Sequence, residues 1–224
     1  MQYSKVLFDL DGTLTDPGEG ITKSVAFALA HFGITVPSLE ALYCFIGPPL
    51  SESFTEYYGF DEEKTATAIA KYREYFARQG IFENRLFDGI PALLRDLKAA
   101  GKTLLLATSK PEAFAKEILK HFALDGYFSV VCGAPMHAPR GYGKADVIKA
   151  VLERAGITDT ADAVMVGDRH HDIDGAHQMG LAAIGVLFGY GSRAEHERAG
   201  ADAIAASIED LRALLLPNNK TKEI

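Results

Sequence analysis

Short apolar runs alternate with longer amphipathic segments along this chain. The first run, 5–9, is stopped by a turn that contains a glycine, which is typical of a strand buried on both faces of a parallel sheet. Four similar runs follow, each separated from the next by helical spacing: 103–107, 128–132, 163–166 and 182–187. This alternation predicts a doubly wound α/β core, a Rossmann-like parallel sheet with helices on both faces.

A long insertion separates the first strand from the second. It covers about ninety residues, far more than a single crossover helix needs. No strand-like alternation interrupts its successive helical patterns, which cover 17–32, 38–45, 49–58 and 61–78. We therefore expect an inserted α-helical domain at 16–84, a core formed by 1–15 and 85–216, and a flexible tail at 217–224.

The composition of the chain limits the kinds of molecule that it is expected to bind. Of the 224 residues, 48% are apolar and 24% are charged, as in ordinary globular proteins, and the net charge of −7 argues against a nucleic-acid polymer as partner. Cys44 and Cys132 lie far apart without metal-ligand spacing, so we expect reduced thiols. Because no apolar run is long enough to span a bilayer, we expect no membrane partner and a cytoplasmic location.

Two carboxylates follow the first predicted strand. Asp9 and Asp11 lie on either side of one leucine, and Gly12 and Thr13 come next. The C-terminal ends of the strands are the edge at which open α/β sheets bind ligands, and two acids there can share one cation. The alternative is an acidic turn in which Gly12 supplies only a permissive backbone.

Hydroxyl groups end the second predicted strand. Thr108 and Ser109 precede Lys110 and Pro111, where a helix is expected to begin with proline in its first turn. Hydroxyls and free amide groups at such a point favour a phosphoryl oxygen. The alternative for these two residues is a plain helix N-cap.

A lysine and a further pair of acids complete the set. Lys144 begins a helix predicted to continue to Ala155, where the helix dipole disfavours a cation, and this conflict suits a residue kept to neutralise charge. A solvated surface lysine is the alternative. Asp168 follows another strand, with Asp172 four residues later. The neighbouring residues His170 and His171 are interpreted as exposed loop residues, because they have no suitably placed cysteine or histidine partner.

Together these segments resemble the phosphatases of the haloacid dehalogenase superfamily, in which Asp-x-Asp-Gly-Thr follows the first strand. The resemblance covers nearly the whole chain. It implies that Asp9 attacks phosphorus and that Asp11 is the general acid and base. It further implies that Thr108 and Lys144 are catalytic and bind the phosphoryl group. Ser109 stands where many relatives have asparagine and is a candidate substrate contact.

The resemblance also implies a magnesium site. Asp168 would complete an all-oxygen set with the Asp9 side chain and the Asp11 backbone carbonyl, which is the kind of ligand that Mg²⁺ prefers. Asp172 is included among the candidate metal residues, either through a water of the ion or by orienting the site. We therefore expect Mg²⁺ as the cofactor.

The insertion resembles the type 1 cap of the phosphoglycolate phosphatase-like branch. Such caps cover the site and exclude water. Within it Gly47 and Pro48 form a turn that relatives place near the leaving group, and we expect both to contact substrate. This turn, with the segment 189–192, is most similar to a subgroup of 5′-nucleotidases. A nucleoside would need an aromatic platform, for which the candidates are Phe54, Tyr57 and Tyr58.

We therefore expect a Mg²⁺-dependent phosphomonoester hydrolase that acts on a small phosphorylated metabolite, with a 5′-mononucleotide as the best candidate substrate. The chain is expected to be a monomer or a homodimer. Alternatives are a phosphoglycolate or sugar-phosphate phosphatase, a phosphomutase, and a noncatalytic module that binds phosphorylated metabolites.

Overall fold

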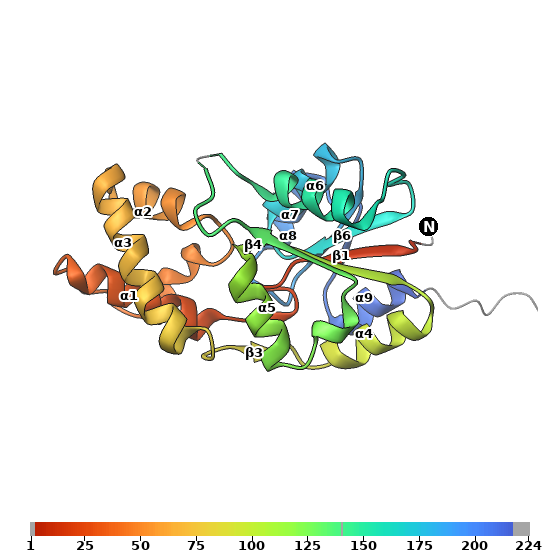
Figure 1. Ribbon diagram of the computed structural model, residues 1–224, viewed down its shortest axis with the longest axis horizontal. Helices are drawn as coiled ribbons and strands as arrows, with labels where there is room; N and C mark the ends of the chain where they lie inside the picture. The colour runs from red at the N-terminus through yellow and green to blue at the C-terminus, as the bar shows by residue number, and fades with distance from the viewer. Residues whose placement is uncertain (1–2, 140, 217–224) are drawn as a thin grey trace, which may run out of the picture. The chain divides into compact units, whose positions relative to one another are not determined.

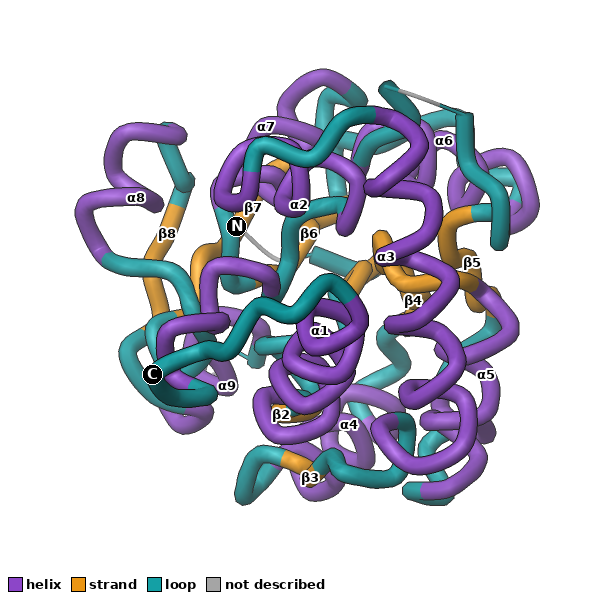
Figure 2. The backbone as a smooth tube through the Cα atoms, turned by 90° about the vertical axis from the view of Figure 1, so that its left-hand side faces the viewer, coloured by secondary structure: helices purple, strands orange, loops and turns teal. Residues whose placement is uncertain are grey.

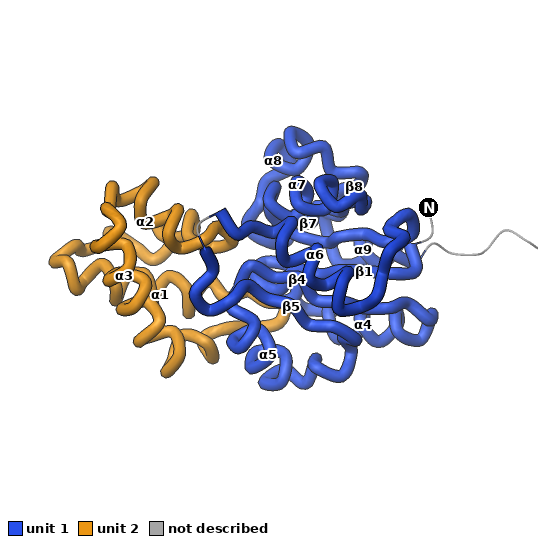
Figure 3. The backbone as a smooth tube through the Cα atoms, turned by 45° about the horizontal axis from the view of Figure 1, so that its top comes forward, with its two compact units in different colours: residues 1–14, 87–224 blue, residues 15–86 orange. Residues whose placement is uncertain are grey.

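The chain forms two compact units. The computed structural model describes residues 3–139 and 141–216. Unit 1 comprises Met1–Leu14 and Phe87–Ile224, and unit 2 comprises Thr15–Leu86 (Figure 3). The insertion expected at 16–84 thus begins one residue after unit 2 begins and ends two residues before unit 2 ends. The expected tail, 217–224, lies outside the described residues.

Unit 1 is built on a six-stranded sheet in which every neighbouring pair is parallel. In chain order its strands are β1 Lys5–Phe8, β4 Thr103–Pro111, β5 Val130–Ala134, β6 Ala163–Gly167, β7 Ala182–Val186 and β8 Ala203–Ala205. Their order across the sheet is β5-β4-β1-β6-β7-β8, so the chain builds outward from β1 in one direction and then in the other. This confirms the predicted doubly wound sheet and places its switch point beside β1.

Helices cover both faces of this sheet (Figure 1). One face carries α6 Lys144–Ala155 and α7 His170–Gln178, and the other carries α4 Ile90–Ala99, α5 Glu112–His121 and α9 Ile208–Leu215; α8 Arg193–Ala199 packs against α7. Leu7, Leu105 and Met165 share a buried core with Ile148 of α6 and Ile173 of α7. Burial on both faces explains why the central strands are uninterrupted apolar runs.

Three strand predictions differ from the structure. The strand expected to end at Ala107 continues to Pro111, with a register shift against β5 between Thr108 and Pro111. The strand expected from Phe128 begins at Val130, because a 3₁₀ turn, η3 Asp125–Tyr127, precedes it. No strand was expected at β8, a three-residue edge strand with two alanines that offers little periodicity to detect.

Unit 2 is mainly helical. It contains α1 Gly18–His31, the 3₁₀ helix η1 Glu40–Phe45, α2 Leu50–Tyr58, α3 Glu62–Tyr75 and a π-helical turn, η2 Phe76–Gly80. As expected, no strand interrupts these helices between residues 17 and 84, all of which the structure describes. Two short strands that were not expected, β2 Thr15–Asp16 and β3 Arg85–Leu86, flank the helices and pair antiparallel (Figure 2). Two-residue strands are too short to produce an alternating pattern. Among residues 3–139 and 141–216, no helix combines the length and apolar character needed to cross a bilayer.

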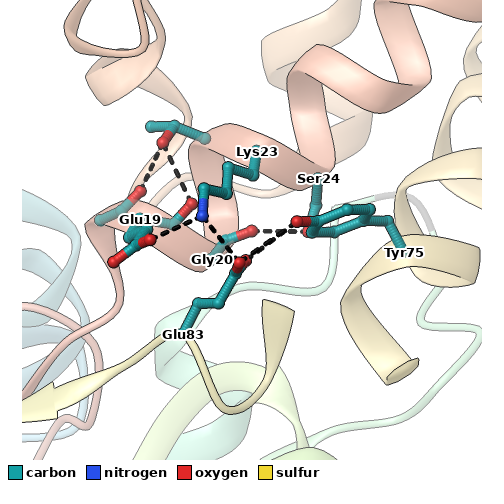
Figure 4. Close-up of polar contacts among 8 residues, drawn as sticks. Glu19, Gly20, Lys23, Ser24, Tyr75 and Glu83 are labelled. Atoms are coloured by element: carbon teal, nitrogen blue, oxygen red, sulfur yellow. Dashed lines mark hydrogen bonds and ion pairs between the residues drawn. The ribbon is translucent and has the colours of Figure 1, made fainter. Parts of the chain in front are cut away.

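Glycines bring α1 and η2 into close contact. A Cβ atom added to Gly20 would lie 2.0 Å from the carbonyl oxygen of Gly80, so only glycine fits there. Beside this contact Lys23 Nζ lies 2.6 Å from Glu19 Oε1 and 2.8 Å from Glu83 Oε1 (Figure 4). Tyr75 also donates a hydrogen bond to Glu83. These contacts give Lys23 a role in holding unit 2 together.

Candidate active site

The carboxyl ends of β1, β4 and β6 bring the predicted chemical residues to one edge of the unit 1 sheet. Asp9 follows β1, Thr108 lies near the end of β4, and Asp168 follows β6. All three side chains are buried. One carboxylate oxygen from each of Asp9, Asp168 and Asp172 lies within 4.8 Å of the others. The topology thus gathers three acids from two distant parts of the sequence into one buried cluster.

Lys144 lies among these acids. Its Nζ atom is 2.9 Å from Asp9 Oδ1 and 2.7 Å from Asp172 Oδ1, and it donates a hydrogen bond of 3.0 Å to the carbonyl oxygen of Ala107. Burial alone would lower the pKa of Lys144, but Asp172 and Asp9 outweigh burial and raise it, so the ammonium stays charged. This buried cation is not the solvated surface lysine considered as an alternative.

Glycines allow the backbone to close tightly around Asp168. A Cβ atom on Gly12 would lie 2.1 Å from Asp168 Oδ2, and one on Gly191 would lie 1.9 Å from the Asp168 carbonyl oxygen. Between β7 and α8, Tyr190 N donates a hydrogen bond of 2.8 Å to Asp168 Oδ2. Gly12 also has a φ angle of +80°, which a side chain would strain. Gly12 therefore has a steric role beyond that of a permissive turn.

The acidic cluster fits a divalent cation. Burial raises the pKa of Asp168 well above its usual range, and repulsion from Asp172 and Asp9 adds to this effect. Burial likewise raises the pKa of Asp172, to about 6. Among the described atoms, Asp168 Oδ1 is buried without a hydrogen-bond partner. Mg²⁺ prefers oxygen ligands, and a cation at this position would offset the repulsion among these closely spaced carboxylates.

Asp11 has a buried partner that the sequence interpretation did not identify. Lys110 Nζ lies 2.6 Å from Asp11 Oδ2, and the two side chains are 5% and 12% exposed. Burial raises the pKa of Asp11, and Lys110 partly offsets this rise. Lys110 was not selected because the second strand was expected to end at Ala107. In a longer strand Lys110 and Thr108, two residues apart, lie on the same face, and this spacing could have identified Lys110 as a site residue.

The remaining candidates have different surroundings. Thr108 is buried, and its Oγ1 accepts a hydrogen bond of 3.3 Å from the backbone of Lys110, whereas Ser109 is half-buried. Gly47 and Pro48 belong to unit 2, in the turn between η1 and α2, so their contact with substrate stays a prediction. Phe54 is fully buried and stacks on Phe60, which excludes it as an exposed platform for a base.

The prediction that the two histidines beside Asp168 are exposed loop residues is wrong. His170 and His171 form the first turn of α7 and are partly buried. Glu195 Oε1 accepts hydrogen bonds from Arg169 Nε at 3.0 Å and from the His170 backbone at 2.9 Å. Burial alone would raise the pKa of Glu195, but these hydrogen bonds hold it at about 2. Glu195 thus anchors the turn between Asp168 and α7.

Comparison with known proteins identifies the family of this chain. The profile of the haloacid dehalogenase-like hydrolases matches residues 6–186. A 5′-nucleotidase from Pseudomonas aeruginosa is 49% identical over 195 residues, which cover 87% of each chain. Tyrosine-protein kinase PtkA from Mycobacterium tuberculosis is 40% identical over 212 residues, covering 94% of this chain and 72% of the kinase.

A solved structure is also similar to this chain. The crystal structure of a predicted phosphatase from Clostridium acetobutylicum has a TM-score of 0.93 and 48% sequence identity. The match covers 96% of this chain and 99% of that one. With the family profile and the buried acidic site, these similarities establish the class of enzyme. The chain belongs to the haloacid dehalogenase-like hydrolases and is a phosphatase.

Proposed function

We propose that this phosphatase hydrolyses small phosphomonoesters, with 5′-mononucleotides as its best substrates, through an aspartyl phosphate formed on Asp9. The observation that carries the proposal is the contact of 2.9 Å between Lys144 Nζ and Asp9 Oδ1 in a buried cluster. Lys144 keeps a negative carboxylate in place and can also bind phosphoryl oxygens as charge shifts toward them.

In the first step an Asp9 carboxylate oxygen attacks phosphorus, and the bond from phosphorus to the ester oxygen breaks. Asp11 gives its proton to that oxygen, so the alcohol leaves neutral. Lys144 and the Thr108 hydroxyl bind the equatorial phosphoryl oxygens and stabilise their negative charge. This holds the phosphorus in line between the Asp9 oxygen and the ester oxygen. The products of this step are the free alcohol, aspartyl phosphate at residue 9 and ionised Asp11.

In the second step water attacks the phosphorus of the aspartyl phosphate. Asp11 accepts a proton from that water, the bond between phosphorus and the Asp9 oxygen breaks, and phosphate leaves. Both side chains return to their starting states. A nucleophile beside a proton carrier is more than binding requires, which favours an enzyme over a noncatalytic module.

Mg²⁺ is the proposed cofactor. The side chains of Asp9 and Asp168 and the backbone carbonyl of Asp11 would hold it, and when bound it would supply positive charge beside the phosphoryl group. Asp172 Oδ1 pairs with Lys144 at 2.7 Å, and Asp172 Oδ2 accepts a hydrogen bond of 3.1 Å from the Arg169 backbone. Because both oxygens are engaged, an orienting role for Asp172 is favoured over direct binding of the ion. Buried acids with raised pKa values support the assignment.

The choice of a nucleotide rests on the 5′-nucleotidase relative, which covers most of this chain. Ser109, Gly47 and Pro48 are the proposed contacts to the leaving group. Tyr57, which is 45% exposed, is the better candidate for stacking on a base, since Phe54 is buried. Phosphoglycolate and sugar phosphates are the alternative substrates, and a phosphomutase would return the phosphoryl group to a sugar.

Phosphate release from a panel of esters tests the proposal. Purified enzyme would be given 5′-mononucleotides, phosphoglycolate and sugar phosphates with Mg²⁺ or EDTA, alongside Asp9→Asn and, as the matched control, Asp174→Asn on the exposed side of α7. We expect Mg²⁺-dependent release, fastest with nucleotides, that Asp9→Asn abolishes and Asp174→Asn preserves. Binding of the esters without turnover would contradict the proposed reaction.

Two further assays examine acceptors other than water. Retention of phosphate on the enzyme and a requirement for a sugar bisphosphate would indicate a mutase. Transfer of phosphate from ATP to protein tyrosine would indicate the activity that the name of the mycobacterial relative describes. We expect neither, since water suffices as the acceptor in the proposed second step.

A further inference from the structure

The active site of unit 1 holds a second buried lysine with a different partner from the first. Lys144 contacts Asp9 and Asp172, whereas Lys110 contacts Asp11, with Nζ 2.6 Å from Oδ2. Both lysines are less than 10% exposed. Burying an ammonium group is costly unless it is paired, so the position of Lys110 is tied to the carboxylate it serves.

The two oxygens of Asp11 have different surroundings. Oδ2 is held by Lys110, while Oδ1 is buried without a hydrogen-bond partner among the described residues. A carboxyl group that transfers a proton needs one oxygen free to face the leaving group. The geometry leaves Oδ1 available for this purpose and uses Oδ2 as the anchor.

The backbone of Lys110 is itself held firmly. Lys110 lies in the part of β4 where the register against β5 shifts, and its amide donates a hydrogen bond of 3.3 Å to Thr108 Oγ1. A Cβ atom on Gly133 of β5 would lie 2.4 Å from the Lys110 carbonyl oxygen, so the neighbouring strand also packs against it. Irregular strand segments commonly redirect a side chain at active sites.

From these contacts we infer that Lys110 is the positioning residue of the general acid: it binds Asp11 Oδ2 so that Oδ1 carries the proton to the departing ester oxygen. This inference rests on the proposed function. As the bond from phosphorus to that oxygen breaks, the proton moves from Oδ1 to the alcohol, and Lys110 remains beside the carboxylate that is left. When water attacks, Oδ1 takes a proton back.

The dependence of the rate on the leaving group separates positioning from general damage. An alcohol such as the 5′-hydroxyl of a nucleotide needs a proton to leave, whereas 4-nitrophenolate does not. The quantity to compare is kcat/KM, because it reports the steps up to departure of the leaving group. Lys110→Met removes the cation, and Asp11→Asn provides the reference for complete loss of the acid.

Lys116→Met is the matched control, since Lys116 pairs with Glu112 at the same distance of 2.6 Å but lies exposed on α5. We expect Lys110→Met to lower kcat/KM for a 5′-mononucleotide by about 100-fold, at the lower end of the range for lost acid–base catalysis, and that for 4-nitrophenyl phosphate by less than about 5-fold. Lys116→Met should change neither. Lys110→Gln, which keeps a donor but not the charge, provides a second variant if the methionine protein does not fold.

Equal losses with both substrates in a folded variant would overturn the inference, as would unchanged kinetics. Inactivity of the unmodified enzyme toward both esters would instead refute the proposed function, so the two failures are distinguishable. A thermal transition for each variant, compared with that of Lys116→Met, establishes which proteins are folded.

Discussion

Gly12 and Asp168 are in such close contact that a single methyl group does not fit between them: a Cβ atom on Gly12 would lie 2.1 Å from Asp168 Oδ2. The two residues follow strands β1 and β6, which are neighbours in the sheet but far apart in the sequence. The first acidic motif therefore limits where the Asp168 carboxylate can lie.

Gly12→Ala should disturb the proposed metal site as well as the backbone. We expect a loss of stability of about 1 kcal/mol from the positive φ angle and a further loss from the clash with Asp168. Gly101→Ala is the matched control, because its φ of +77° is almost the same and nothing lies within 4 Å. Calorimetric titration with Mg²⁺ should give weaker binding for Gly12→Ala only; equal affinities in the two variants would contradict the steric argument.

Mg²⁺ should stabilise the folded protein. A ligand at about one hundred times its Kd contributes about 2.7 kcal/mol, which for a chain of this size raises Tm by about 5 to 10 °C. The rise should disappear on adding EDTA and be much smaller in Asp168→Asn, which loses a proposed ligand. Thermal melts with and without Mg²⁺ measure this, and an undiminished rise in Asp168→Asn would place the ion elsewhere.

Lys144→Met should impair both stability and turnover. It leaves Asp9 and Asp172 buried without their cation, and breaking a buried pair typically costs about 3 to 5 kcal/mol. We expect a lower Tm and a kcat lower by at least about 100-fold. Lys149→Met, at an exposed position of the same helix, is the control. A variant that kept normal kcat would remove Lys144 from the mechanism.

His171 should reduce the stability of the metal-free protein as the medium becomes acidic. Burial lowers the pKa of this residue from 6.5 to about 4, with repulsion from His170 and Arg169 adding to the effect. Between those two pH values the unfolded chain binds a proton that the folded chain does not, so stability is lost as pH falls. Because His171 is only partly buried, we expect about 1 to 2 kcal/mol across this range.

Denaturant titrations from pH 4 to 8 in EDTA would measure this loss. The curve for His171→Gln should be flatter than that of the unmodified protein, while His137→Gln, at an exposed loop position, serves as the control. Parallel curves for His171→Gln and the unmodified protein would rule out the proposed contribution.

Position along the chain made much of the site predictable. Parallel strands place their carboxyl ends at one edge, so the acids after β1 and β6 could be brought together before any geometry was known. The side-chain contacts were not predictable in this way. Lys110 was missed because the apolar run ends at Ala107 and the strand was expected to end with it, and the strand irregularity that follows depends on β5. The pair between Lys144 and Asp172 likewise joins two helices.

Helical geometry in unit 2 was harder to predict than helical location. The apolar spacing at 38–45 indicated a helix, but it does not distinguish the 3₁₀ form that η1 adopts. The segment after α3 contains a π-helical turn, where Gly80 meets Gly20. That contact joins residues sixty positions apart, so the periodicity of either segment alone does not reveal it.

The short ribbon of β2 and β3 has a consequence for the modular history of the chain. Thr15 is paired with Leu86, and Phe87 N donates a hydrogen bond of 3.2 Å to the Leu14 carbonyl oxygen. The points where the chain leaves and re-enters unit 1 are therefore neighbours, although 72 residues of unit 2 lie between them. An insertion with adjacent ends can be lengthened, shortened or exchanged for another without moving a strand of the sheet. Recombination at this junction would let new selectivity evolve while the proposed catalytic acids stayed in place.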